Sequence, residues 1–255
     1  MKRIRLVIEY DGTDYHGWQR QKDRPTIQSV LEERLARITS ERIRLVSAGR
    51  TDAGVHSLGQ VAAFSTSSRL TPEEFKRALN SLLPDDIRII KAEEVPLDFH
   101  PRFFAKAKSY LYFIYLGERP PVFVSRYCWP VKAELNIKAM EEAGRYIIGT
   151  HDFSGFRASG CGARTTVRSI FELSINKEDA LPFLGIKIRE GFIKFRVTGN
   201  AFLRYMVRNI VGTLVEIGRG KRKADSIVDI LNKGDRQLAG ITAPARGLFL
   251  EEVYY

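Results

Sequence analysis

Ser47-Ala48-Gly49-Arg50-Thr51-Asp52-Ala53-Gly54-Val55-His56 is the stretch around which the chain is organised. Strand-like residues flank it at 43–46 and 61–64, so we expect it to connect two strands. Its two glycines tolerate left-handed conformations and the close approach of another backbone. A loop fixed by two strands can present chemical groups. The same residues also fit a simple turn in which Asp52 accepts backbone N–H groups and pairs with Arg50.

The residues around this loop predict a β-α-β-β-α-β unit over residues 1–104. Apolar and polar residues alternate at 3–10, as in a half-buried strand. The other predicted elements are a helix from about Thr26, strands at about 42–48 and 59–66, a helix beginning at the capping box Thr71-Pro72-Glu73-Glu74, and a strand from Ile87. This order is that of a ferredoxin-like unit.

Residues 105–255 predict the same order with longer insertions. The first elements are a strand at 109–116, a helix capped by Asn136 and a strand at about 166–175. A hairpin follows, in which Leu184, Ile186 and Ile188 would pair with Ile193, Phe195 and Val197 across a turn at Glu190-Gly191. The last elements are a helix capped by Asn200, a helix at 224–231 and a strand at 246–253. The predicted fold class is therefore α+β. Two ferredoxin-like or RNA-recognition-like units would join their antiparallel sheets around a basic central cleft.

Positive charge dominates the composition and indicates an anionic partner. The 255 residues carry 41 Lys and Arg against 30 Asp and Glu, a formal net charge of +11. The excess of positive charge favours nucleic acid over a membrane surface as the partner. The alternative is a generally basic or heat-adapted protein, whose charge needs no such partner. Part of the charge would lie on one sheet face, or on a solvated edge, formed by Lys187, Arg189, Lys194 and Arg196.

Several classes of site and location are not expected. Cys128 and Cys161 are too few and too far apart for a disulfide framework or a cysteine-based zinc site. No metal-ligand spacing such as HxxxH or CxxC occurs, so we expect no metal or cofactor. Glu9 interrupts the first apolar stretch, which argues against a signal peptide, and no apolar run approaches the roughly 20 residues of a membrane span. We expect a soluble cytoplasmic protein.

Asp52 is the leading candidate for a catalytic residue. The guanidinium of Arg50, two positions earlier, would keep its carboxylate ionised at neutral pH. An ionised carboxylate can act as a nucleophile or a base without a metal. His56 could shuttle protons, but a local hydrogen-bonding role is the interpretation we favour.

Other residues have a functional and a structural interpretation that the sequence leaves open. Tyr110 could stack on an extruded base or pack in the core. Arg204 and Arg208, four positions apart, could bind phosphate or pair with Asp52, or could form a solvated helix face. His151-Asp152-Phe153-Ser154 contains the residue types of a triad, but consecutive residues rarely align in that geometry.

An ordered set of motifs resembles the tRNA pseudouridine synthase A family along nearly the whole chain. The matching stretches are Tyr10-Asp11-Gly12-Thr13, Gly17-Trp18-Gln19, Gly49-Arg50-Thr51-Asp52-Ala53-Gly54-Val55-His56, Phe99-His100-Pro101-Arg102, Lys108-Ser109-Tyr110-Leu111-Tyr112, Gly149-Thr150-His151-Asp152-Phe153, Phe202-Leu203-Arg204-Tyr205-Met206-Val207-Arg208-Asn209 and Ala243-Pro244-Ala245-Arg246-Gly247-Leu248. The ordered set is far more specific than any one motif.

The resemblance implies a cofactor-free homodimer that isomerises uridine to pseudouridine. Its target would be at about positions 38–40 of the tRNA anticodon stem-loop, and the base would first be extruded from its stack. By match to the family motifs, Asp52 is the nucleophile and Tyr110 stacks on the target uracil. Arg50 and Arg208 are arginines placed near the aspartate in the same comparison.

Two other functions fit parts of the sequence. A non-catalytic RNA-binding module would explain the charge and element order, but would leave the acid–arginine loop without a role. A metal-free phosphodiesterase could use His56 and Asp52, but the chain has no second histidine in a comparable loop. For a synthase, the sequence does not decide whether Asp52 attacks C1′ or C6, or which base removes the C5 proton.

Overall fold

The computed structural model describes residues 1–160, 162–181 and 186–255, so Cys161 and Leu184 lie outside the described residues. The chain is a mixed α+β protein whose strands are mostly antiparallel. It divides into two compact units: unit 1 contains residues 1–106 and 249–255, and unit 2 contains residues 107–248. The chain therefore departs from the predicted division at its C-terminal end, which belongs to unit 1.

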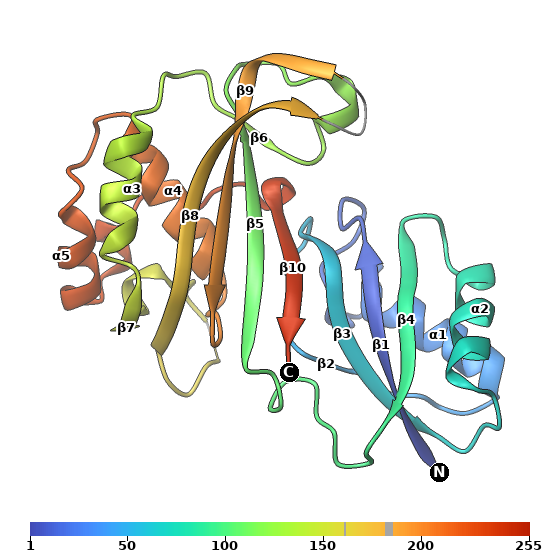
Figure 1. Cartoon of the computed structure of the whole chain (residues 1–255). Helices are drawn as coiled ribbons and strands as arrows, with labels where there is room; N and C mark the ends of the chain where they lie inside the picture. The colour runs from blue at the N-terminus through green and yellow to red at the C-terminus, as the bar shows by residue number, and fades with distance from the viewer. Residues whose placement is uncertain (161, 182–185) are drawn as a thin grey trace. The chain divides into compact units, whose positions relative to one another are not determined.

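Unit 1 is a sheet packed against two helices (Figure 1). Its elements are β1 (Lys2–Tyr10), α1 (Ile27–Thr39), β2 (Val46–Ser47), β3 (His56–Thr66), α2 (Pro72–Leu82), β4 (Ile87–Val95) and most of β10 (Leu248–Tyr254). Strand β1 is antiparallel to both β3 and β4, and β2 is antiparallel to β3. Strand β10 runs parallel to β3, with Phe249 opposite His56. The C-terminal strand thus lies beside the strand that follows the Asp52 loop.

The alternation predicted for β1 creates the core of unit 1. Ile4, Leu6 and Ile8 are fully buried and belong to one cluster with apolar residues of both helices. In the same cluster the rings of Phe64 and Phe75 meet edge to face, with centroids 5.3 Å apart. Burying each such side chain contributes roughly 1.5–3 kcal/mol, so this cluster holds the helices on the sheet.

Both helices of unit 1 begin where the sequence predicts. Thr26 caps α1 and Thr71 caps α2, each through a reciprocal capping box. In α2 the Thr71 side chain accepts the N–H of Glu74, and the Glu74 carboxylate accepts the N–H of Thr71 at 2.7 Å. Hydrogen bonding from Thr71 lowers the pKa of the Glu74 carboxyl. The predicted capping box at Thr71 is confirmed, whereas for α1 only a start at about Thr26 was predicted; both caps depend only on residues close in sequence.

The strand predicted at about 42–48 is much shorter than expected. Only Val46–Ser47 pair with β3 as β2. The backbone of Leu45 is instead bonded to side chains of α1: its N–H donates to Glu32 Oε1 at 3.0 Å, and its carbonyl accepts from Gln28 Nε2 at 3.2 Å. These bonds satisfy the polar groups that a strand ladder would otherwise satisfy.

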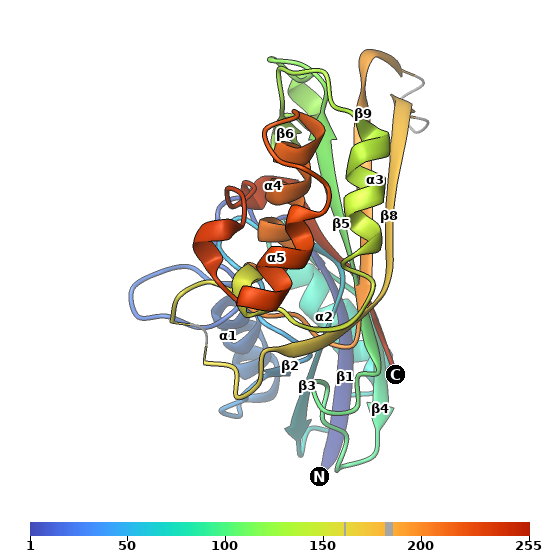
Figure 2. The ribbon, with the colours of Figure 1, turned by 90° about the vertical axis from the view of Figure 1, so that its left-hand side faces the viewer.

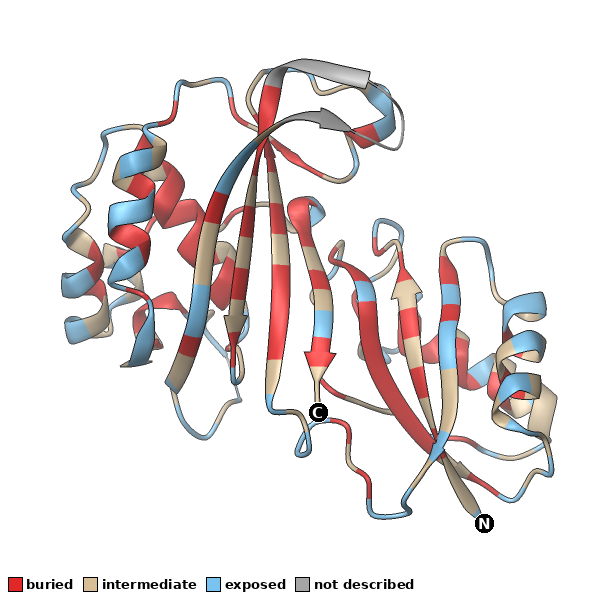
Figure 3. Cartoon of the chain, in the orientation of Figure 1, coloured by how far each residue is buried: buried red, intermediate tan, exposed pale blue. Residues whose placement is uncertain are grey.

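Unit 2 is a second sheet, with strands in the order β5-β9-β8-β7, and its helices lie on one side of it (Figure 2). Its elements are β5 (Ala107–Tyr115), β6 (Trp129–Pro130), α3 (Ile137–Arg145), β7 (Gly149–Asp152), β8 (Val167–Leu181), β9 (Ile186–Gly199), α4 (Met206–Gly218) and α5 (Ser226–Lys233), with 3₁₀ turns at Val122–Val124, Ser154–Phe156, Arg236–Leu238 and Ala245–Gly247. Helix α4 is buried along nearly its whole length (Figure 3).

Two predictions for unit 2 are wrong, and one is confirmed. No turn occurs at Glu190-Gly191, because both residues lie inside β9. Gly191 has a φ of +80°, so it marks an irregularity within the strand. Asn200 does not cap a helix: its Oδ1 accepts the N–H of Ser169 at 3.0 Å. The side chain of Asn136 does cap α3, by accepting the N–H of Ala139.

The capping box of α2 provides a stability prediction. Thr71→Ala removes the hydroxyl that accepts the Glu74 N–H, so we expect a loss of about 1 kcal/mol in the free energy of unfolding. Thr71→Ser keeps the hydroxyl and should lose less than half as much. Urea denaturation of both variants measures the difference, and equal losses would show that the cap contributes little.

Candidate active site

Asp52 lies in a tight loop between β2 and β3 whose backbone is fixed by hydrogen bonds. The Asp52 carbonyl accepts the N–H of Val55 at 3.2 Å, and Gly54 takes a left-handed conformation with φ +75°. On the other side of Asp52, the Gly49 carbonyl accepts from Gln60 Nε2 at 2.9 Å. The Asp52 residue itself is half-buried. The loop therefore holds a carboxylate at a defined position without burying it completely.

A second loop, residues 11–18 after β1, is bonded to the Asp52 loop through Thr51. The N–H of Trp18 donates to the Thr51 carbonyl at 3.1 Å. The hydroxyl groups of Tyr10 and Thr51 form a buried hydrogen bond of 2.8 Å. Burial raises the pKa of Tyr10 to about 12, so this hydroxyl stays protonated at neutral pH. The residue before Asp52 is thus fixed through both its main chain and its side chain.

Two glycines allow the two loops to touch backbone to backbone. A Cβ on Gly12 would lie 2.0 Å from the carbonyl oxygen of Val55. A Cβ on Gly17 would lie 2.6 Å from the carbonyl oxygen of Thr51, and Gly17 also has a φ of +85°. No side chain fits at such distances, so glycine is required by space at both positions. In the sequence, Gly12 and Gly17 stand out only as parts of the family motifs, and their contact with the Asp52 loop was not predicted.

His56 links the two loops to the C-terminal strand. The residue is 1 % exposed, and its ring stacks on Phe249 of β10 with centroids 4.6 Å apart. Its Nδ1 lies 3.1 Å from the backbone nitrogen of Gly12 and 3.0 Å from Oδ1 of Asp11. A neutral ring can accept from Gly12, and a charged ring can pair with Asp11, so either form ties β3 to the 11–18 loop. The favoured hydrogen-bonding interpretation of His56 is therefore confirmed.

The four predicted site residues divide equally between the units. Asp52 and the exposed Arg50 lie in unit 1, and Tyr110 and Arg208 lie in unit 2. Tyr110 is 8 % exposed and pairs with Val197 of β9 across the sheet.

Tyr110 also packs within unit 2. Its ring meets Phe202 edge to face, with centroids 4.9 Å apart. The core-packing interpretation of Tyr110 thus describes part of what the ring does, and the small exposed part is what a ligand could reach.

Arg208, on the first turn of α4, is held by a reciprocal pair of hydrogen bonds. Its Nε donates to the Ala243 carbonyl at 2.7 Å, and the Ala243 N–H donates to the Arg208 carbonyl at 3.1 Å. Its guanidinium lies 4.6 Å from the ring centre of Tyr205, a residue with a φ of +65°. The guanidinium of Arg204 lies 4.9 Å from the centroid of the same ring, but Arg204 precedes the helix. The prediction that both arginines share a helix face is therefore wrong.

Polar residues that sequence analysis did not single out support Arg208. Asn209 is fully buried: its Nδ2 donates to the Phe156 carbonyl at 2.7 Å, and its Oδ1 accepts from Thr242 Oγ1 at 2.6 Å. Arg236 Nη2 also donates to Asn209 Oδ1, at 3.1 Å. Buried polar groups of this kind are costly to leave unpaired, so the network fixes the segment before Ala243. Its signal in the sequence was an asparagine among the apolar residues of α4.

The predicted positive sheet face is partly neutralised. Lys194 forms an ion pair with Glu178, and Arg196 pairs with Glu172 at 3.3 Å, so these two cations of β9 face acids on β8. The side chains of Lys187 and Arg189 lie outside the described part of the chain. These partially exposed pairs are each worth little to stability, but they reduce the positive charge available to a ligand.

The residue types of a triad at 151–154 do not form one. Nε2 of His151 lies 3.1 Å from the Ile148 carbonyl, and Asp152 Oδ1 accepts the backbone N–H of Ser154 at 2.8 Å. Hydrogen bonding by Thr166 is the largest cause of a lowered pKa for Asp152. The sequence-based exclusion of a triad agrees with these contacts.

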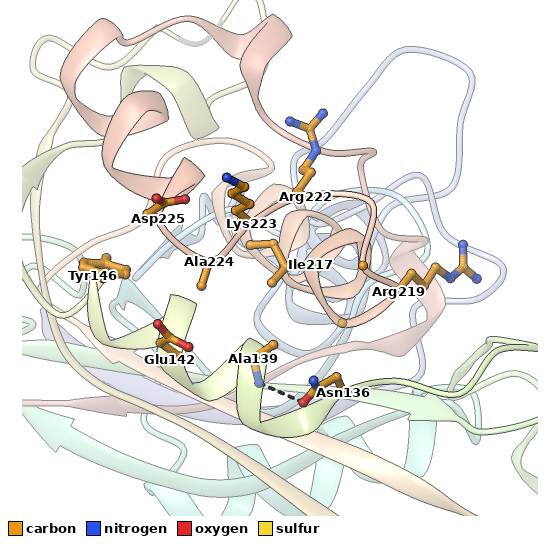
Figure 4. A pocket seen from close by; sticks show the side chains of 12 residues that line it. Asn136, Ala139, Glu142, Tyr146, Ile217, Arg219, Arg222, Lys223, Ala224 and Asp225 are labelled. Carbon is orange, nitrogen blue, oxygen red and sulfur yellow. Dashed lines mark hydrogen bonds between the residues drawn. The ribbon is translucent and has the colours of Figure 1, made fainter.

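A cavity of about 660 Å³ in unit 2 lies among α3, α4 and α5 (Figure 4), and none of the four predicted site residues lines it. Acids and cations both line it, including Glu142, Asp225 and Lys223. Arg222, which also lines the cavity, forms an ion pair with Glu216, with 2.6 Å between Nε and Oε2. Among the described residues, no three metal-binding side chains cluster, and no helix is both long and apolar enough to cross a bilayer.

The family model and the sequence relatives indicate one family. The family model described as tRNA pseudouridine synthase matches residues 6–103 and 143–255. The tRNA pseudouridine synthase A of Acetivibrio thermocellus is 46 % identical over 255 residues, covering 100 % of both chains. That of Thermodesulfovibrio yellowstonii is 44 % identical over the same coverage. A crystal structure of the archaeal box H/ACA sRNP Nop10-Cbf5 complex matches 95 % of this chain and 58 % of that chain, at 12 % identity and a TM-score of 0.35.

The contact between the two loops gives a testable prediction. Gly12→Ala places a methyl group 2.0 Å from the Val55 carbonyl, so the loops must separate, at a cost of about 1–3 kcal/mol in the free energy of unfolding. Gly162→Ala is the matched control, because a Cβ there meets nothing within 4 Å. Thermal denaturation compares the two. Equal stability of both variants would contradict the tight contact.

Proposed function

The chain belongs to the tRNA pseudouridine synthase family and is an isomerase acting on tRNA, and we propose that Asp52 is its nucleophile. We place the target at about positions 38–40 of the anticodon stem-loop, where the uridine must first be extruded from its stack. The observation that supports Asp52 is the fixed position of its half-buried carboxylate, in a loop bonded to β3 and to residues 11–18.

The reaction rearranges one nucleotide without oxidation or reduction. The C1′–N1 glycosidic bond breaks, the uracil turns, and a C1′–C5 bond forms. The C5 hydrogen leaves as a proton, and N1 gains a proton, so the product is an isomer of the substrate. A positioned carboxylate suits this chemistry because it can form and then release a covalent bond. Attack at C1′ of the ribose and attack at C6 of the base both satisfy this balance.

The other predicted site residues would serve binding and positioning. The ring of Tyr110 would stack on the extruded uracil and replace part of the stacking lost on extrusion. Arg208, fixed to Ala243, would present a cation near the reacting nucleotide. The exposed guanidinium of Arg50 would lie beside Asp52 and help to keep its carboxylate ionised.

These roles require Asp52 and Tyr110 to face the same bound nucleotide. We therefore propose that the two units are ferredoxin-like halves whose sheets join around a basic cleft. In unit 1 the element order β1-α1-β2-β3-α2-β4 supports this description. The proposal includes a homodimer that works in the cytoplasm without a cofactor. The net charge of +11 supports binding to the phosphates of a folded tRNA.

Release of tritium tests the function directly. The protein is incubated with unmodified tRNA that carries tritium at C5 of uridine, and the label released into water is counted. We expect release by the wild-type protein and at least a roughly thousandfold slower rate for Asp52→Asn, because an amide is a poor nucleophile. Affinity for tRNA should change only a few-fold, because phosphate contacts dominate binding.

Asp14→Asn is the matched control, since Asp14 is an exposed acid in the neighbouring loop. It should release tritium at close to the wild-type rate. Full activity of Asp52→Asn would refute the nucleophile assignment. A parallel loss of activity and affinity in Asp52→Asn would instead indicate that Asp52 has a structural role.

The stacking role of Tyr110 predicts a difference between two substitutions. Tyr110→Ala removes the ring and should lower kcat/KM by roughly five- to 150-fold, which corresponds to about 1–3 kcal/mol of stacking per base. Tyr110→Phe keeps the ring and should lose much less. Steady-state tritium release measures both values. An equal loss in both variants would assign the effect to the hydroxyl group and not to stacking.

A further inference from the structure

The turn at residues 99–104 presents an aromatic side chain that the proposed chemistry does not use. Phe103 is 76 % exposed, although Phe99, four positions earlier, is buried in unit 1. Exposing a phenylalanine to this extent forgoes the stabilisation that burial would provide. Phe104, the next residue, is also 49 % exposed, and adjoining apolar side chains on a surface are a feature of binding sites.

Hydrogen bonds hold this turn in one conformation. The N–H groups of Phe103 and Phe104 both donate to the His100 carbonyl, at 3.1 and 3.0 Å. The hydroxyl of Tyr255 donates to the Pro101 carbonyl at 2.9 Å, which attaches the turn to the C-terminal residue. The exposed ring is thus presented by a backbone that is already ordered, so a ligand would bind with little loss of conformational entropy.

Two nitrogen-rich side chains flank the Phe103 ring. The imidazole of His100 lies against it, with ring centroids 4.3 Å apart and planes tilted by 32°. The guanidinium carbon of Arg102 lies 5.9 Å from the ring centroid. Lys106 is also exposed. Residues 97–107 contain one acid, Asp98, so cations outnumber acids in this segment. An aromatic ring beside an arginine and a lysine is a pattern with which proteins bind single-stranded nucleic acid.

We propose that Phe103 is a stacking platform for an unpaired base of the tRNA substrate, separate from the target uridine. The inference rests on the proposed function for the identity of the RNA. Stacking accepts any base, because every base has a π face, and Arg102 would contact the adjacent phosphate. The platform would thus add affinity without selecting a sequence.

Another exposed phenylalanine shows what distinguishes this site. Phe123 is 75 % exposed in unit 2, and it follows Val122, which is 83 % exposed. Within the described parts of the chain, no ring or guanidinium packs against Phe123. Phe123 therefore matches Phe103 in exposure but lacks its imidazole and guanidinium neighbours, which makes it a suitable control.

Tryptophan fluorescence tests the proposal directly. The two natural tryptophans, Trp18 and Trp129, are 1 % and 9 % exposed, so a tryptophan at position 103 would be the main solvent-exposed fluorophore. On titration with unmodified tRNA, Phe103→Trp should show quenching as a base stacks on the indole. Phe123→Trp should show no comparable quenching. Equal quenching in both variants, or none in Phe103→Trp, would overturn the proposal.

The same titration distinguishes a protein partner. If Phe103 contacts a second copy of this chain, the emission of Phe103→Trp should shift to the blue with rising protein concentration and without RNA. That result would also overturn the proposal.

A second variant measures the contribution of the ring. Phe103→Ala should weaken tRNA binding by roughly five- to 150-fold, with Phe103→Tyr close to the wild-type affinity and Phe123→Ala unchanged. At saturating tRNA, the tritium release by Phe103→Ala should return to near the wild-type rate. Normal affinity of Phe103→Ala in an active protein refutes only this site. Absence of tritium release from the wild-type protein refutes the proposed function itself.

Discussion

The contact between the backbones of residues 11–18 and 51–55 is the constraint on which the candidate site depends. Gly12 and Gly17 leave no room for a side chain, and the Gly54 N–H donates to the Tyr15 carbonyl at 3.3 Å. Hydrogen bonds between backbones depend little on side-chain rotamers, so they position a loop more rigidly than side-chain contacts would. Asp52 gains a fixed backbone position from its neighbours while the residue itself is only half-buried.

Unit 2 positions its arginine by the same means. Helix α4 approaches the later segment so closely that a Cβ on Gly212 would lie 1.8 Å from the Ile241 carbonyl. Asn209 and Arg236 then satisfy the polar groups of that segment inside the protein. In both units, a buried strand or helix bonds to the backbone of an irregular segment. In unit 1 the segment bonded by β3 carries Asp52, and in unit 2 the helix α4 itself carries Arg208. Such support explains how loops can hold chemistry in place.

Sequence patterns predicted the elements whose causes are local. The alternation in β1, the start of α1 near Thr26 and the caps at Thr71 and Asn136 depend on residues within one or two turns, and the structure confirms them. The failures occurred where distant groups compete for the same backbone. Side chains of α1 bond Leu45 and end a predicted strand, and Ser169 takes the Asn200 side chain that was expected to begin a helix.

The sequence by itself determined the family, the acidic loop and the identity of the candidate nucleophile, because these depend on residue types in a fixed order. It could not determine how that loop is held. Only the tertiary structure decided that residues 11–18 support it, that Phe249 covers His56, and that the last strand belongs to the first unit. These contacts join residues far apart in the chain, and their geometry depends on the whole packed sheet and not on any local pattern.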